Sequence, residues 1–199
     1  MDAAHNSVMN GLFFTVGGLV ALAYGVFMVG LRKGRMWRVQ SESGASMDQV
    51  KAWFQPTHGW LSDLLRRGIV FSLGMALVII GAGEITEKTI GFRSGEAMLV
   101  GTILSYVLGL SLLAAPVFGA LFVLLCGERI AAVNVLMSLR ECGYDYTRAV
   151  RETRRLGRAG PIFSVGIRVF GLGLLGIAWF VGSTMTVNLV PPLQAWFNR

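Results

Sequence analysis

Charged, histidine and cysteine side chains are scarce in this chain. Its 199 residues include 2 histidines and 2 cysteines. Only 15% of the residues are charged, whereas a soluble domain usually carries about 25%. Hydrophobic residues make up 54% of the sequence. The composition is too apolar for an ordinary soluble domain, so we expect a membrane protein.

The few cysteines and histidines do not form a recognisable metal or disulfide pattern. Cys126 and Cys142 lie 16 positions apart without a CxxC motif, and on one helix they would be about 24 Å apart, beyond disulfide reach. His5 and His58 have no ligand partner at a suitable spacing. We therefore predict no metal, no haem or other cofactor, and no disulfide-relay chemistry.

Catalytic constellations are also missing from the sequence pattern. Segment 171–176 matches GxGxxG, yet that motif binds dinucleotides only between a strand and a helix of a soluble α/β unit. Here it lies inside an apolar run, where helix packing is the better interpretation. No nucleophile stands beside a base. We predict no catalytic residue and no enzyme, and rank a lipid-modifying enzyme last among the candidate functions.

Long apolar runs dominate what is present. A transmembrane helix needs about 20 consecutive apolar residues, and segments 8–31, 68–83, 98–125 and 162–190 approach or exceed this length. The second is the shortest, and an extension into 60–65 or to Ile85 is the alternative to these bounds. Residues 1–7 lack the basic region that opens a signal peptide, so we expect the first run to be a retained helix. The sequence predicts an all-α, polytopic integral membrane protein with four transmembrane helices in a single membrane domain, 1–199.

Basic residues are concentrated between the apolar runs. Segment 32–67 has seven basic and three acidic residues (+4), segment 127–161 has seven and four (+3), and segment 84–97 has two and three (−1). An excess of Lys and Arg marks the cytoplasmic side. We therefore predict a bacterial-type inner (plasma) membrane protein with basic loops 32–67 and 127–161 in the cytoplasm. Loop 84–97 and both termini are predicted on the outer, periplasmic side.

Both basic loops contain helix signals. Ser46 and Gln49 have the spacing of a capping box, which predicts a helix over 47–54 that Pro56 ends. Asp145 is the predicted N-cap of a later amphipathic helix, and Gly143 the C-cap of the helix before it. The loops are thus predicted to form amphipathic helices at the cytoplasmic interface.

Arginines on these loops are predicted to face anionic lipid headgroups. They are Arg66, Arg67, Arg148, Arg151, Arg155, Arg158 and Arg168. Tyr146, Val150, Thr153 and Leu156 lie on another face of the later helix. A solvated helix, or one docked on a protein partner, is the alternative. Arg168 is the only ionisable residue within the predicted spans. It lies close enough to the cytoplasmic end to snorkel to the interface, which is the favoured interpretation, and binding of a lipid headgroup or a partner carboxylate is the alternative.

The helix of the third apolar run is predicted to continue past the membrane. From Glu96 to Arg140 only Pro116 and several glycines interrupt its helical character. Ile130, Val133, Leu136 and Met137 extend its apolar stripe. We expect one long helix with a kink near Pro116.

Small residues recur at four-residue spacing within the apolar runs, and such stripes let helix backbones approach closely in lipid. The predicted packing and partner-interface residues are Gly17, Ala21, Gly25, Gly101, Ser105, Gly109, Ala115, Gly119, Ala178 and Gly182. Four helices need fewer than four such faces among themselves, so we expect some to serve neighbouring subunits. Internal packing alone is the alternative.

A short likeness links the two basic loops. Segments 64–74 and 156–166 share six of eleven residues at an offset of 92, and each leads into an even-numbered span. Internal repeats are common in membrane proteins, so two parallel helical hairpins related by duplication would explain the likeness. Convergence on an interfacial arginine followed by small residues explains it as well.

Together these patterns predict a non-enzymatic structural or assembly subunit of a multi-protein inner-membrane complex, of the secretion or conjugation machinery class. The expected partners are other membrane subunits or further copies of the chain, and anionic lipids of the inner leaflet. Nucleic acid is not expected, since acids are interspersed among the basic residues. The alternative is a small channel or transporter formed by a four-helix protomer, either alone or as a homo-oligomer. Its polar path would include Asn10, Thr102, Ser105, Tyr106, Thr184 and Asn188.

Overall fold

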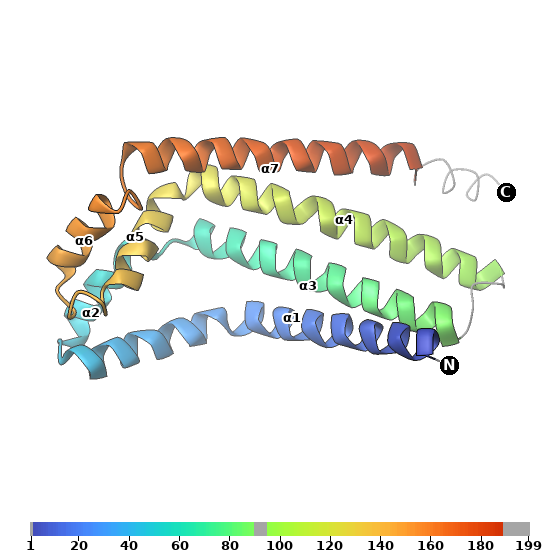
Figure 1. The fold of residues 1–199 in the computed structure, drawn as a ribbon, viewed down its shortest axis with the longest axis horizontal. Coiled ribbons are helices and arrows are strands. Elements are labelled where there is room, and N and C mark those ends of the chain that lie inside the picture. Colours follow the sequence, from blue (N-terminus) through green and yellow to red (C-terminus); the bar gives the residue numbers. More distant parts are fainter. Residues whose placement is uncertain (1, 90–94, 189–199) are drawn as a thin grey trace. The chain divides into compact units, whose positions relative to one another are not determined.

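The described part of the chain is mostly helical. Figure 1 shows the computed structural model, which describes residues 2–89 and 95–188. These residues form α1 (Asp2–Ser43), α2 (Met47–Phe54), the 3-10 helix η1 (Gln55–Thr57), α3 (Trp60–Thr89), α4 (Gly95–Leu125), α5 (Gly127–Ser138), α6 (Tyr146–Arg155) and α7 (Pro161–Asn188). No strand occurs within them.

Four of the helices are long and apolar enough to cross a membrane. The candidate spans are Val8–Met28, Trp60–Thr86, Val100–Leu125 and Pro161–Met185. The prediction of an all-α, polytopic membrane protein is thereby confirmed. Residues 90–94 of the predicted outer loop and 189–190 of the predicted fourth span lie outside the described residues.

The second span is longer than the predicted 68–83. α3 begins at Trp60 and continues to Thr89, because arginine is a good helix former and does not interrupt the backbone ladder. Asp63, Arg66, Arg67 and Glu84 therefore lie within the candidate span. The expectation that Arg168 is the only ionisable residue in a span was wrong.

The single long helix predicted from Glu96 to Arg140 is divided into two. Pro116 lies inside α4 without ending it. The break comes at Cys126, whose φ of −121° and ψ of 21° leave the helical region, and α5 starts at Gly127. Glycine is a poor residue for a helix interior. Gly127 therefore favours a break at this point, where the apolar run is followed by charged residues.

The chain divides into two compact units. Unit 1 comprises Met1–Val26, Arg67–Phe118 and Leu175–Arg199, and unit 2 comprises Phe27–Arg66 and Gly119–Leu174. Each unit contains parts of the four long helices. The short helices α2, η1, α5 and α6 lie wholly in unit 2.

Reciprocal glycine contacts hold α1 against α3 in unit 1. A Cβ atom built on Gly18 would lie 2.6 Å from the carbonyl oxygen of Gly74, and one on Gly11 would lie 2.9 Å from that of Gly81. Such distances exclude a side chain, so the two backbones touch. Gly11 and Gly18 are seven residues apart, as are Gly74 and Gly81. Seven residues are about two helical turns, so each pair lies on one helix face.

Glycines also shape the seam between α4 and α7, but through side chains. In unit 1 a Cβ on Gly109 would lie 2.7 Å from Sδ of Met185. In unit 2 a Cβ on Gly171 would lie 2.8 Å from Cγ of Leu124. Gly171 and Ala178 of α7 are buried on this seam. Trp179 is 80% exposed, so α7 packs along a narrow stripe.

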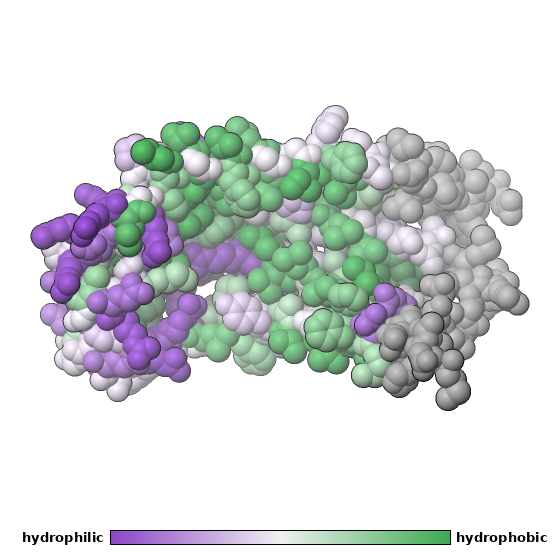
Figure 2. Space-filling model, viewed as in Figure 1, coloured by the Kyte–Doolittle hydropathy of each residue, from purple (hydrophilic) through white to green (hydrophobic). Residues whose placement is uncertain are grey.

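The short-helix cluster, consisting of α2, α5 and α6, has a small core of its own in unit 2. Hydrophilic residues gather over these helices in Figure 2. The core consists of Val135, Leu139, Cys142 and Ala149, with Val39, Trp53, Leu136, Tyr144, Tyr146 and Val150 packed against it. The rings of Trp53 and Tyr146 are stacked, with centroids 6.3 Å apart. The basic loops therefore form packed structure rather than isolated helices.

Local capping signals explain where these helices begin. The Ser46 hydroxyl accepts a hydrogen bond from the Gln49 amide at 3.3 Å, and the Gln49 side chain accepts one from the Ser46 amide at 3.0 Å. The Asp145 carboxylate accepts one from the Arg148 amide at 3.1 Å. Both predicted N-caps are confirmed. α5 ends at Ser138, and the helical turn after it closes at Gly143 as predicted: at φ +64° the Gly143 amide donates to the Arg140 carbonyl oxygen at 3.2 Å, and the Tyr144 amide donates to that of Leu139 at 2.9 Å.

Candidate functional site

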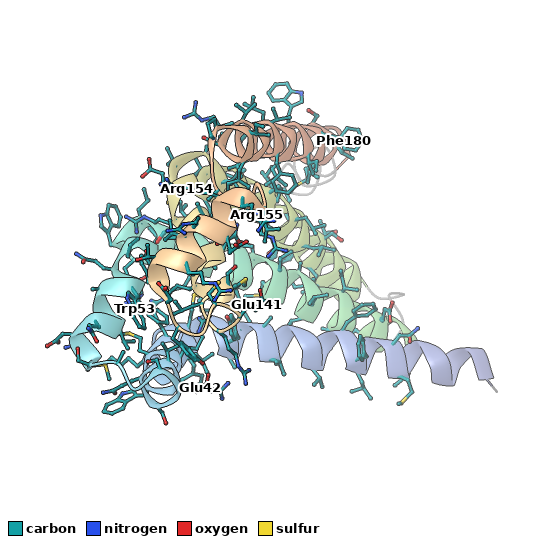
Figure 3. The ribbon with its side chains drawn as sticks, turned by 60° about the vertical axis from the view of Figure 1, so that its left-hand side comes forward. Glu42, Trp53, Glu141, Arg154, Arg155 and Phe180 are labelled. Atoms are coloured by element: carbon teal, nitrogen blue, oxygen red, sulfur yellow. The ribbon has the colours of Figure 1, made fainter. Side chains whose placement is uncertain are left out.

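α6 is buried on one face and basic on the other. Ala149 and Thr153 are fully buried, and the Thr153 hydroxyl donates to the Ala149 carbonyl oxygen at 2.7 Å. The exposed residues of α6 and of the turn after it include Arg148, Arg151, Arg154, Arg155 and Arg158, which we call the arginine face. Arg154 and Arg155 are labelled on α6 in Figure 3.

Few acids neutralise the arginine face. Arg155 lies 3.5 Å from the Glu152 carboxylate. Within residues 2–89 and 95–188, no other ion pair involves this face. Leu156, predicted on the apolar face, is 57% exposed instead, because α6 ends at Arg155. Of the arginines that the sequence singled out, Arg148, Arg151, Arg155 and Arg158 therefore belong to this exposed face, whereas Arg66, Arg67 and Arg168 lie elsewhere.

Side-chain contacts of Glu42 connect α1 to the turn after α5. Glu42 is labelled near the end of α1 in Figure 3. The Tyr144 hydroxyl donates a hydrogen bond to the Glu42 carboxylate, and Nε of Arg140 lies 4.0 Å from the same group. The hydrogen bond to Glu42 raises the pKa of Tyr144 above its ordinary value. Tyr144 has a φ of +62°, so this contact is made from a strained backbone.

Arg66 and Arg67 lie near the start of α3 and are both half-buried. In unit 2 the Arg66 guanidinium carbon lies 5.0 Å from the centroid of the Phe122 ring, a cation–π distance. In unit 1, Nε of Arg67 is buried without a hydrogen-bond partner among the described residues. Their placement differs from that of the arginine face, since part of each side chain is covered by protein.

A basic cavity of about 700 Å³ lies in unit 2, lined by η1, the α4–α5 junction and the start of α7. Its polar lining includes Gln55, His58, Glu128, Arg129, Ser164 and Arg168. Ser164 and Arg168 are four residues apart on α7, so they share one helix face. Of the predicted headgroup residues, Arg168 alone belongs to this lining.

Arg129 is held in a fixed position at this cavity. Its Nη1 donates to the Ser62 hydroxyl at 3.1 Å, and its guanidinium packs directly against Gly59, where a Cβ would collide with it. Asp63, one residue after Ser62, instead pairs with Arg32 at 3.0 Å. Arg129 was not among the predicted site residues. The small residues Gly59 and Ser62, which flank the start of the second apolar helix, were the signal in the sequence that a long side chain could pack there.

His58 adds an imidazole group to the same cavity. Nδ1 of His58 lies 2.9 Å from the Thr57 hydroxyl, which donates to the Phe54 carbonyl oxygen at 2.7 Å. Because the Thr57 hydroxyl has a single proton and donates it to Phe54, it accepts from His58, and Nδ1 is the donor. Burial, and then the nearby positive charge of Arg32, lower the pKa of His58 below its ordinary value. The surroundings of His58 thus disfavour the charged imidazolium form.

The predicted small residues fall into different environments. Gly25, Gly109, Ala115, Gly119, Ala178 and Gly182 contact neighbouring helices or are buried. Ala21 and Gly101 are half-buried, and Gly17 and Ser105 are exposed. The packed stripe of α1 is instead Gly11, Gly18 and Gly25. Glycine recurs every seven residues in both α1 and α3. This seven-residue spacing, rather than the predicted four-residue spacing, indicates the helix contact.

Hydroxyl groups in the spans bond to their own helices. The Ser105 hydroxyl donates to the Gly101 carbonyl oxygen at 2.8 Å, and the Thr184 hydroxyl donates to that of Phe180 at 2.9 Å. A hydroxyl bonded to the preceding turn is an ordinary way to satisfy a polar side chain in a helix. The hydroxyls of Ser105 and Thr184 are therefore satisfied within their own helices.

The arginine face and the basic cavity are the two features best suited to binding. Both present guanidinium groups, which match the geometry of carboxylates and phosphates. No protein-family description, curated protein or solved structure matches the chain. The geometry of the chain itself is therefore the basis for its functional assignment.

Proposed function

We propose that the protein is a non-enzymatic structural or assembly subunit of a multi-protein complex in a bacterial-type inner membrane. Its class is that of secretion or conjugation machinery. In this proposal the two basic loops face the cytoplasm and both termini face the outer side, as the excess of Lys and Arg in the loops favours. The single observation that supports the proposal best is the arginine face of α6.

The arginine face is suited to an acidic protein surface. Its arginines extend from a helix whose opposite side is fixed by the fully buried Ala149 and Thr153. A fixed base lowers the conformational entropy lost when a partner binds, and guanidinium groups form paired hydrogen bonds with carboxylates. We therefore expect a cytoplasmic partner with exposed Asp and Glu side chains.

The outer surface of α7 supports contacts with a further membrane subunit. No described atom lies within 4 Å of a Cβ built on Gly166, Gly173 or Gly176. Gly166 and Gly173 are seven residues apart and share a helix face. Small residues on an uncovered face allow another helix to approach closely in lipid.

Purification in a mild detergent tests this function. The full chain is expected to co-purify with other membrane and cytoplasmic proteins. The triple variant Arg148→Gln, Arg151→Gln, Arg155→Gln should lose the cytoplasmic partner and keep its helical circular-dichroism spectrum. The matched control is Lys33→Gln, Arg35→Gln, Arg38→Gln, which removes three equally exposed charges from α1. A wild-type chain that purifies as a lone monomer would refute the proposal.

A further inference from the structure

The basic cavity lies beside the ends of three candidate spans. Its residues 55–58 precede the span that begins at Trp60, and residues 123–129 surround the end of the span at Leu125. Ser164 and Arg168 follow the start of the last span at Pro161. Trp60 is 79% exposed, and tryptophan is enriched at the headgroup level.

Two arginines line this cavity from different helices. Arg129 belongs to α5 and Arg168 to α7, so neither depends on the other for its position. No acid forms an ion pair with either of them within the described ranges. Glu128 is the acidic residue of the lining, and it is exposed. The positive charge of the two arginines therefore exceeds the single negative charge of Glu128.

Neutral donors complete the lining. Gln55 and Ser164 both line the cavity, and their side chains can donate hydrogen bonds. The first N–H groups of a helix lack intrahelical partners, and at the start of α5 the Cys126 side chain forms no capping hydrogen bond. The positive end of the α5 dipole thus adds to the charge of the arginines.

We propose that this cavity binds a phosphate group, carried by an anionic phospholipid headgroup or by a soluble phosphate ester. Donors from three separate elements suit a tetrahedral phosphate, whose oxygens point in several directions. A volume of about 700 Å³ accommodates a headgroup or a small ester rather than a bare ion. The inference is independent of the assembly role, because the arginine face lies on other residues.

Lipid binding to the full-length chain, measured by native mass spectrometry after delipidation in detergent, tests the proposal. The lipid arm compares phosphatidylglycerol with diacylglycerol of the same acyl chains, and the soluble arm uses glycerol 3-phosphate. Arg168→Gln should weaken binding of the phosphate-bearing probe by about tenfold, since a hydrogen bond to a charged group is lost. Arg38→Gln, an equally exposed arginine outside the cavity, should leave it unchanged.

Ser164→Ala provides a second variant that leaves the charge intact and should weaken binding by a smaller factor. Sensitivity of phosphatidylglycerol alone to Arg168→Gln would identify a lipid headgroup, and sensitivity of glycerol 3-phosphate would identify a soluble ester. The proposal is overturned if diacylglycerol binds as well as phosphatidylglycerol and glycerol 3-phosphate does not bind. It is also overturned if both cavity variants bind every probe as the wild type does.

Discussion

Gly17 and Gly18 are neighbours in sequence and opposites in environment. A Cβ on Gly18 would lie 2.6 Å from a backbone oxygen of α3, whereas a Cβ on Gly17 would meet nothing within 4 Å among the described atoms. One glycine is therefore required for close approach, and the other is not. The sequence alone did not separate them, because both belong to plausible small-residue stripes and only the neighbouring helix decides which stripe is used.

Gly18→Ala should accordingly destabilise the protein. The added methyl group forces the backbones of α1 and α3 apart, and overpacking of this kind costs about 1–3 kcal/mol. Gly17→Ala is the matched control and should be neutral or slightly stabilising, because alanine is favoured over glycine in a helix by up to about 1 kcal/mol. Thermal unfolding in detergent measures both. Equal melting temperatures for the two variants would contradict the close contact.

Tyr144 should titrate above the ordinary tyrosine pKa of about 10. Its pKa is raised because its hydroxyl donates to the Glu42 carboxylate. A raised pKa means that this contact contributes its full stability below the unfolded-state pKa and loses it as the pH rises through the folded pKa. Tyrosinate absorbance during an alkaline titration, compared with Tyr144→Phe, isolates this group. Glu42→Gln should shift its titration to lower pH.

The short helices show which elements local sequence can specify. α2 begins and ends where the Ser46–Gln49 pair and Pro56 predicted, because capping depends on residues within one turn. The division between α4 and α5 was missed, since the apolar pattern continues across Gly127. The buried face of α6 was only partly predicted, because the core that covers Ala149 comes from segments distant in sequence.

The N-cap of α6 offers a test at this scale. Asp145→Ala removes the hydrogen bond to the Arg148 amide, and loss of such a cap typically costs about 1 kcal/mol. Hydrogen exchange of the α6 amides should therefore become several times faster. The control is Asp48→Ala on α2, whose carboxylate pairs with exposed Lys51 instead of capping a helix. Unchanged exchange in α6 would show that its core contacts alone fix the helix.

At the scale of the whole molecule, the four membrane-spanning helices follow from length and composition. Apolar runs of this length have few other stable arrangements, because lipid requires internal satisfaction of backbone polar groups. The positions of functional side chains do not follow in the same way. Arg129 owes its position to two small residues of another segment. Gly59 leaves room for its guanidinium, and the Ser62 hydroxyl accepts a hydrogen bond from it. Arg129, Gly59 and Ser62 all lie outside the similar segments 64–74 and 156–166, so that likeness does not predict the contact.

Membrane orientation is the prediction that belongs to this scale. A cysteine replacing Thr89, the last residue of α3, should react with an impermeant thiol reagent in intact cells. A cysteine replacing Ser43 at the end of α1 should react only after the cells are opened. The two native cysteines are buried and provide a low background. Labelling of Ser43→Cys alone in intact cells would reverse the proposed topology.

The glycine pairs between α1 and α3 have a consequence for biosynthesis. Gly11, Gly18, Gly74 and Gly81 all belong to α1 and α3, which precede α4 and α7 in the chain and therefore leave the ribosome before them. Their mutual contact requires no residue of α4 or α7. The first hairpin can therefore close while the rest of the chain is still being translated, which leaves the α4–α7 seam as the later step of membrane insertion.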